Sequence, residues 1–173
     1  MAESAPVPDR QQQLYWVQMV ELKVAACYIR RYRDYLSNWV TAVGTLRAVA
    51  SSGAIAAWAL WQEYAFVWGA IIAASQVGDA LRDVFPFTKK HKAAGEHTIT
   101  LNRLLIDAQL EWENIFSGHY TGDQIVARRH KLMKLQHDAE RASFPDGLAT
   151  RAPIFAQAQQ EARSYFKATY SIN

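Results

Sequence analysis

The chain has 173 residues, half of them hydrophobic, which is enough to bury the core of one domain and argues against disorder. Nineteen Lys and Arg against sixteen Asp and Glu leave a net charge of +3, too small and dispersed for a nucleic-acid-binding surface. We therefore expect no nucleic-acid partner. The single cysteine, Cys27, lies in no redox or metal motif, and the N-terminus shows no signal-peptide pattern, so we expect no cleaved leader.

The first predicted element is a long helix over residues 11–39, which we assign to a cytoplasmic N-terminal region, residues 1–39. The segment contains no Gly or Pro, and we expect it to run directly into the next region. Three of its tyrosines, at 28, 32 and 35, are predicted to pack rather than to bind a ligand. Its apolar residues recur at three-to-four-residue spacing or a multiple of it: Leu14, Val17, Val20, Val24, Tyr28, Tyr35 and Trp39.

Residues 40–87 are predicted to form a transmembrane helical hairpin. Fifteen uncharged residues precede Glu63, from 48 to 62, and fifteen follow it, from 64 to 78. Extended outward to 40–61 and 64–85, each half is about 22 residues or roughly 33 Å long, which spans a hydrocarbon core of about 30 Å. The hairpin would place two helices side by side in a bilayer.

Aromatic and basic residues are distributed as the two interfaces of a membrane require. Basic residues flank only the open end of the hairpin, so the positive-inside rule places both termini in the cytoplasm. The aromatic residues near the turn are Trp58, Trp61, Tyr64 and Trp68, and those near the open end are Tyr35, Trp39, Phe85 and Phe87. The basic residues are Lys23, Arg30, Arg31, Arg33, Arg82, Lys89, Lys90 and Lys92.

One basic and one acidic residue lie inside the two predicted spans. Arg47 is sixteen positions before Glu63 and Asp79 sixteen after it, so in an antiparallel hairpin the two reach the same depth and can form an intramembrane charge pair. The alternative is that the Arg47 side chain reaches the interface by itself, while Asp79 pairs with Arg82 along its own helix. The sequence favours neither arrangement.

Small residues on the first span predict a helix-packing face. Rows of small residues let membrane helices approach closely, so we expect the chain to form homo-oligomers. Polar residues of both spans could line a pore between subunits. The predicted packing and pore-lining residues are Gly44, Ala48, Ser52, Ala56, Ser75 and Gln76.

In a second interpretation, residues 40–87 still form a helical hairpin, but the hairpin does not lie in a membrane. Both uncharged runs are shorter than the usual 18 residues, and the first is rich in Ala, Ser and Gly. The hairpin would then be the buried core of a soluble or peripheral all-helical interaction module.

Residues 88–173 are predicted to be a cytoplasmic helical region, which makes the whole chain all-α. The segment 85–98 contains a proline and a glycine and is predicted to be a hinge. An amphipathic helix follows it and ends near Ser117–Gly118, and a capping box, Thr121 to Gln124, opens the next one. Residues 143–147 close that helix, and Pro153 fits the first turn of the last. No alternating strand pattern occurs.

Catalytic and metal-binding patterns are missing from the sequence. Its five histidines lie at none of the usual ligand spacings, so we expect them to be solvated surface residues. There is no Gly-rich phosphate loop and no nucleophile elbow. The basic run 128–131 is predicted to be a solvated helix face. We expect no enzymatic activity, no catalytic residue, no metal and no cofactor.

The layout as a whole resembles the SLATT superfamily, the SMODS and SLOG-associating two-transmembrane effector domains. The resemblance covers roughly residues 11–170: a long helix entering a two-span hairpin, the basic exit KKHK at 89–92, and the segment QLEWENIFSGHYTGDQI at 109–125. Its most specific part is the W-x-x-I pattern from Trp112 to Ile115, followed by the capped helix.

The resemblance implies an effector of a bacterial conflict or anti-phage system. Such effectors oligomerise in the inner membrane and disrupt it or form a pore, often under a partner enzyme that makes or senses a nucleotide signal. The expected partners are therefore the lipid bilayer, further copies of the chain and a separate sensor or nucleotide-signalling protein. Two-span proteins of phages or plasmids share this layout without the killing activity.

Overall fold

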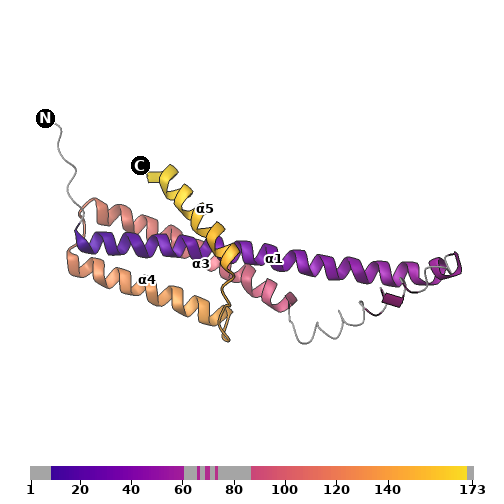
Figure 1. Ribbon diagram of the computed structural model, residues 1–173. Helices are drawn as coiled ribbons and strands as arrows, with labels where there is room; N and C mark the ends of the chain where they lie inside the picture. Colours follow the sequence, from indigo (N-terminus) through magenta and orange to yellow (C-terminus); the bar gives the residue numbers. More distant parts are fainter. Residues whose placement is uncertain (1–8, 61–65, 67–68, 71–72, 74–86, 171–173) are drawn as a thin grey trace. The chain divides into compact units, whose positions relative to one another are not determined.

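A computed structural model describes residues 9–60, 66, 69–70, 73 and 87–170. The helices are α1 (Arg10–Leu60), α3 (Phe87–Phe116), α4 (Gly122–Ser143) and α5 (Ala152–Tyr170) (Figure 1). The described residues contain no β-strand, so the predicted all-α class is confirmed for them. Within the same residues, none of the helices has both the length and the apolar character required to cross a membrane.

The chain divides into two compact units. The first, which we call the bundle, comprises Met1–Tyr32 and Ala93–Asn173; the second comprises Arg33–Lys92. α1 contributes residues to both units. This agrees with the prediction that the N-terminal helix continues into the next region without a break.

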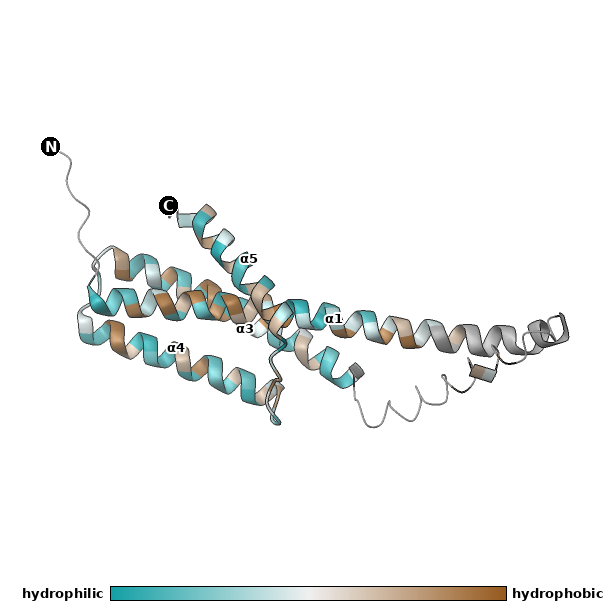
Figure 2. Cartoon of the chain, in the orientation of Figure 1, coloured by the Kyte–Doolittle hydropathy of each residue, from teal (hydrophilic) through white to brown (hydrophobic). Residues whose placement is uncertain are grey.

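Within the bundle, α1 touches each of the other three helices. The Tyr15 hydroxyl donates to the carbonyl of Ala108 on α3 at 3.3 Å. The Gln18 amide donates to Gln136 on α4 at 3.0 Å. Figure 2 shows apolar residues recurring between polar ones along these helices, as a buried stripe requires. The largest fully buried side chains of the bundle are Tyr15, Met19, Leu22, Ile29, Leu101 and Ile115.

The turn from α3 to α4 follows the predicted chemistry. α3 ends at Phe116, and Gly118 adopts a positive φ of 75°, which glycine accommodates without a steric cost. The Thr121 side chain caps α4 by accepting from the Gln124 backbone N–H, and the Gln124 side chain accepts from the Thr121 N–H at 2.9 Å. The predicted helix stop and capping box are both confirmed.

The connection from α4 to α5 is held against α1 by a buried tyrosine. The Tyr28 hydroxyl donates to the Ala149 carbonyl at 3.1 Å and accepts from the Arg151 backbone N–H at 3.1 Å. α5 then begins at Ala152, so Pro153 lies in its first turn as predicted. These contacts confirm the expectation that Tyr28 is a packing residue.

The predicted hinge over 85–98 is wrong for the residues described. α3 begins at Phe87 and passes through Gly95 without interruption. Proline immediately before a helix does not break it, and one interior glycine costs only about 1 kcal/mol. Burial of Ala94, His97 and Leu101 in the bundle offsets that cost.

Candidate functional site

The residues predicted to pack membrane helices are described only in part. Gly44 and Ala48 lie on α1 and are exposed. A methyl group placed on Gly44 would meet no atom within 4 Å among the described residues. Ser52 and Ala56 also belong to α1, but their side chains lie outside the described residues, as do Ser75 and Gln76 altogether. The proposed packing face and pore lining stay predictions.

The predicted interfacial and charged residues are also described only in part. Trp39 is 46% exposed, and its ring packs edge-on against Tyr35 at 6.4 Å between centroids. Asn38 to Thr45 are all exposed except Val43, which is half-buried. The side chains of Arg47 and Trp58 are outside the described residues, and so are Trp61, Tyr64, Trp68 and Asp79. The intramembrane charge pair therefore stays a prediction.

Two of the basic residues assigned to the membrane flank instead form an ion-pair cluster with α5. The Arg30 guanidinium contacts Glu161, and Arg31 Nη2 lies 3.0 Å from the other carboxylate oxygen of Glu161. Arg31 also donates to Gln157 at 2.9 Å. Burial raises the pKa of Glu161, but the hydrogen bonds and positive charge of Arg30 and Arg31 outweigh it, and the pKa is lowered below its usual value. This cluster fastens α5 to α1.

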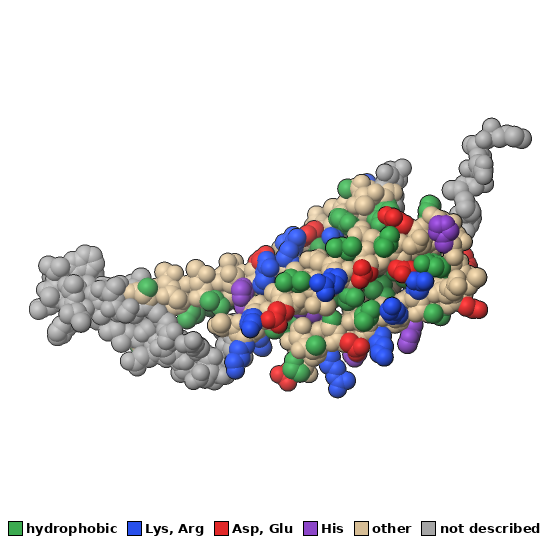
Figure 3. Space-filling view, turned by 180° about the vertical axis from the view of Figure 1, so that it is seen from behind, with side chains coloured by type: hydrophobic (Ala, Val, Ile, Leu, Met, Phe, Trp, Pro, Cys, Tyr) green, Lys and Arg blue, Asp and Glu red, His purple; other side chains and the backbone are tan. Residues whose placement is uncertain are grey.

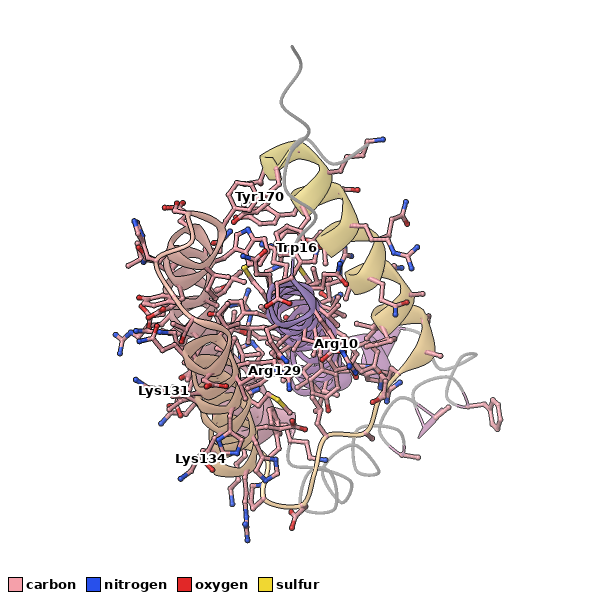
Figure 4. The ribbon with its side chains drawn as sticks, turned by 90° about the vertical axis from the view of Figure 1, so that its left-hand side faces the viewer. Arg10, Trp16, Arg129, Lys131, Lys134 and Tyr170 are labelled. Atoms are coloured by element: carbon pink, nitrogen blue, oxygen red, sulfur yellow. The ribbon has the colours of Figure 1, made fainter. Side chains whose placement is uncertain are left out.

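A second set of contacts between α1, α3 and α5 is aromatic. The Trp16 ring lies 4.9 Å from Trp112, 5.0 Å from Phe166 and 5.1 Å from Tyr170. Figure 4 shows Trp16 and Tyr170 close together at one end of the bundle. Such edge and tilted ring pairs stabilise a core beyond the area they bury. Trp112, which carries the family resemblance, is therefore a packing residue of the bundle.

One concavity of the described residues lies between all four helices of the bundle and has a volume of about 520 Å³. Its lining is mixed, since apolar atoms of α1 face polar groups of the other helices. Its volume falls within the range typical of small-molecule sites. The residues that give it chemical character are Glu21, Tyr28, His97, Glu140, Gln159 and Arg163.

His97 is a buried titratable group of this cavity, with 4% of its surface exposed. Its Nδ1 lies 3.3 Å from the Ser143 hydroxyl, and its ring packs edge-on against Phe144. The expectation that every histidine is solvated is wrong for His97. His97 lies four residues before Leu101, so both side chains lie on the same buried face of α3. This spacing is visible in the sequence and could have indicated that His97 is buried.

Stability of the bundle should fall in mild acid because of this histidine. Burial lowers the pKa of His97 below its ordinary value of 6.5, and this effect exceeds that of the negative charge of Glu140, which raises the pKa. Between the two pKa values the unfolded chain binds a proton that the folded chain excludes, so the free energy of unfolding decreases as pH falls through 6.5. Urea unfolding at about pH 7.5 and about pH 5.5 measures this loss.

The matched variant for this prediction is His97→Gln, which cannot titrate and should lose less stability over the same interval. Glu161 does not interfere, because its lowered pKa acts only below its ordinary value of 4.5. If both proteins lose the same stability, His97 is not responsible.

The basic run 128–131 on α4 does not form one solvated face. Arg128 pairs with Glu111 of α3 and stacks over the Tyr120 ring at 3.9 Å. The Arg129 Nε atom is buried and has no hydrogen-bond partner among the described residues. Lys131 is exposed and points outward, as Lys134 does (Figure 4). The expectation of a wholly solvated face is therefore wrong for its two arginines.

These features define a small all-helical bundle with a mixed cavity, tied together by one aromatic and one ionic cluster. Among the described residues, no group of three or more His, Cys, Asp and Glu side chains is placed to hold a metal ion. Comparison of the chain with known protein families, with curated proteins and with solved structures found no match.

Proposed function

We propose that the chain is a membrane-associated effector of a bacterial conflict or anti-phage system. In this proposal the bundle lies on the cytoplasmic side of the inner membrane, and residues 40–87 form the two-span hairpin. Several copies gather their hairpins and either open a pore or disrupt the bilayer. The activating signal would come from a separate sensor or nucleotide-signalling protein.

The observation that carries the proposal is the character of α1 beyond the bundle. The helix continues to Leu60, and its last thirteen residues, 48 to 60, contain no charge. Before them, Trp39 and Val40 are large apolar residues exposed on the helix surface. An uncharged helical segment that follows exposed aromatic and aliphatic side chains is suited to contact with lipid or with neighbouring helices.

The support for a second span comes from the sequence of residues 64–85 and from the basic residues that follow it. Lys89, Lys90 and Lys92 are exposed at the start of α3. Exposed cations directly after an apolar segment favour the anionic cytoplasmic leaflet, by about 1 kcal/mol each near the surface.

Alkaline carbonate extraction of bacterial membranes tests the proposal. The full chain should stay with the membrane pellet after carbonate treatment and should enter the supernatant only with detergent. A known peripheral protein in the same preparation should be released by carbonate alone. Recovery of the chain in the carbonate supernatant would falsify the integral two-span arrangement.

The second candidate function is a soluble or peripheral helical interaction module without enzymatic activity. It is favoured by exposed apolar side chains on α3, in the bundle itself. In this case the chain would remain in the soluble fraction before any extraction, and its induced expression would not release a dye from vesicles or cells. The same fractionation therefore separates the two candidates.

A further inference from the structure

The outer face of α3 carries a stripe of residues that are all exposed. They follow one another at alternating intervals of four and three residues, the spacing that keeps side chains on one face of a paired helix. Ile99, Ile106 and Leu110 are 67%, 66% and 61% exposed, which is unusual for large aliphatic side chains. We call these residues the α3 stripe: Ile99, Arg103, Ile106, Leu110, Glu113 and, one residue beyond the end of the helix, Ser117.

We propose that the α3 stripe is an interface with a second copy of this chain, in which the two α3 helices pair antiparallel about a two-fold axis. The axis would cross the α3 stripe between Ile106 and Leu110, at the height of Ala108, whose own side chain is buried in the bundle. Residues whose numbers add to 216 would then face each other across it. Because the interface is isologous, each contact occurs twice.

Charge complementarity selects this partner. In an antiparallel pair with this spacing, Ile106 faces Leu110 of the second copy, and Arg103 faces Glu113. Arg103 and Glu113 are both exposed, and neither forms an ion pair among the described residues. This alignment therefore covers Ile106 and Leu110 and supplies a partner to both charges.

Other alignments of the same stripe are less favourable. A parallel pair would place Arg103 opposite Arg103 and Glu113 opposite Glu113, which repel each other. An antiparallel pair shifted by seven residues would place Arg103 against Ile106 and leave the guanidinium facing an aliphatic surface. Only the register centred between Ile106 and Leu110 pairs Arg103 with Glu113 and also matches two aliphatic side chains, Ile106 and Leu110. Ile99 then faces Ser117.

The surface around the stripe is consistent with a wet, specific interface. Phe116, next to the end of the stripe, is 72% exposed. Figure 3 shows apolar side chains lying between basic and acidic ones on the face turned away in Figure 1, without a large area of one charge. Interfaces of this kind combine a small apolar centre with a polar rim.

A charge-swap experiment on the full chain tests the proposal. By multi-angle light scattering over a concentration series, in detergent if the chain needs it, the wild type should be a dimer. Arg103→Glu and Glu113→Arg should each weaken dimerisation at least about tenfold, because each places like charges at two symmetric positions. The double variant restores both pairs and should return to within about threefold of the wild type.

Cysteine cross-linking tests which residues face each other across the interface, and it does not depend on a measured affinity. A mixture of Ile106→Cys and Leu110→Cys chains should form a disulfide-linked dimer under mild oxidation, whereas neither variant alone should link efficiently. Cys27 is buried, so the wild type provides the unlinked control. The proposal would be overturned if all swap variants dimerised equally well, or if the folded proteins formed no mixed cross-link. In either case the α3 stripe would bind a different partner. The result is independent of the carbonate extraction, since the α3 pairing does not require the membrane hairpin.

Discussion

Replacing Trp112 with alanine should lower the free energy of unfolding of the bundle by about 3–5 kcal/mol, the usual cost of removing a buried aromatic side chain. The Trp112 ring is 9% exposed and contacts Tyr15, Trp16 and Phe116. Its removal leaves a cavity between α1 and α3 and deprives Trp16 of one of its three ring contacts. Urea unfolding of the full chain followed by circular dichroism measures the change.

Trp39→Ala is the matched control for this prediction. Trp39 is also a helical tryptophan, but it lies in the second unit with nearly half its surface exposed. Its replacement should change the stability by less than about 1 kcal/mol. Equal losses from the two variants would mean that the bundle core does not centre on Trp112.

Leucine at Ala48 or at Ser52 should abolish the toxicity of the induced protein while leaving its membrane insertion intact. Both positions belong to the predicted small-residue row of α1, and Ala48 is exposed. A larger side chain keeps neighbouring helices apart but does not make the segment less apolar, so assembly is lost and insertion is not. Growth after induction, dye leakage and carbonate extraction give the three measurements.

Ala42→Leu is the matched control, because Ala42 is exposed on α1 but lies on a different side from the row through Gly44, Ala48 and Ser52. It should keep full toxicity. If the Ala48 and Ser52 variants remain as toxic as the Ala42 variant, the proposed packing face is wrong even where the chain is an integral membrane protein.

The helices of the bundle could be predicted from the sequence because their signals are local. Gly118 and Thr121 mark the turn between α3 and α4. Pro153 marks the start of α5 in the same way. Each signal acts within one or two helical turns, so it is visible without knowledge of the tertiary structure.

Apolar spacing also predicts α1 as a helix, but the face expected from Val17 and Trp39 is wrong: these residues are 50% and 46% exposed, and the bundle buries Tyr15, Met19 and Leu22 instead. Both faces have three-to-four-residue spacing, and only tertiary packing decides between them.

The candidate site was less predictable because its parts are far apart in the sequence. Arg30 and Arg31 resemble a membrane-flanking cluster until Glu161, some 130 residues later, is placed beside them. The cavity likewise depends on how four helices meet, whereas the burial of His97 could have been predicted from its spacing to Leu101. The hinge at 85–98 was predicted from one Pro and one Gly, and this prediction was wrong. Burial of α3 residues in the bundle stabilises a continuous helix there despite the glycine.

The continuity of α1 has a mechanical consequence. Its fifty-one residues run from Arg10 to Leu60 as one helix, about 77 Å along the axis at 1.5 Å per residue. An unbroken helix resists local twisting, so a ligand or partner that turned its first half would also turn the second. In the proposed effector, a rotation of the part of α1 that lies in the bundle would then change the direction in which Gly44 and Ala48 face neighbouring copies.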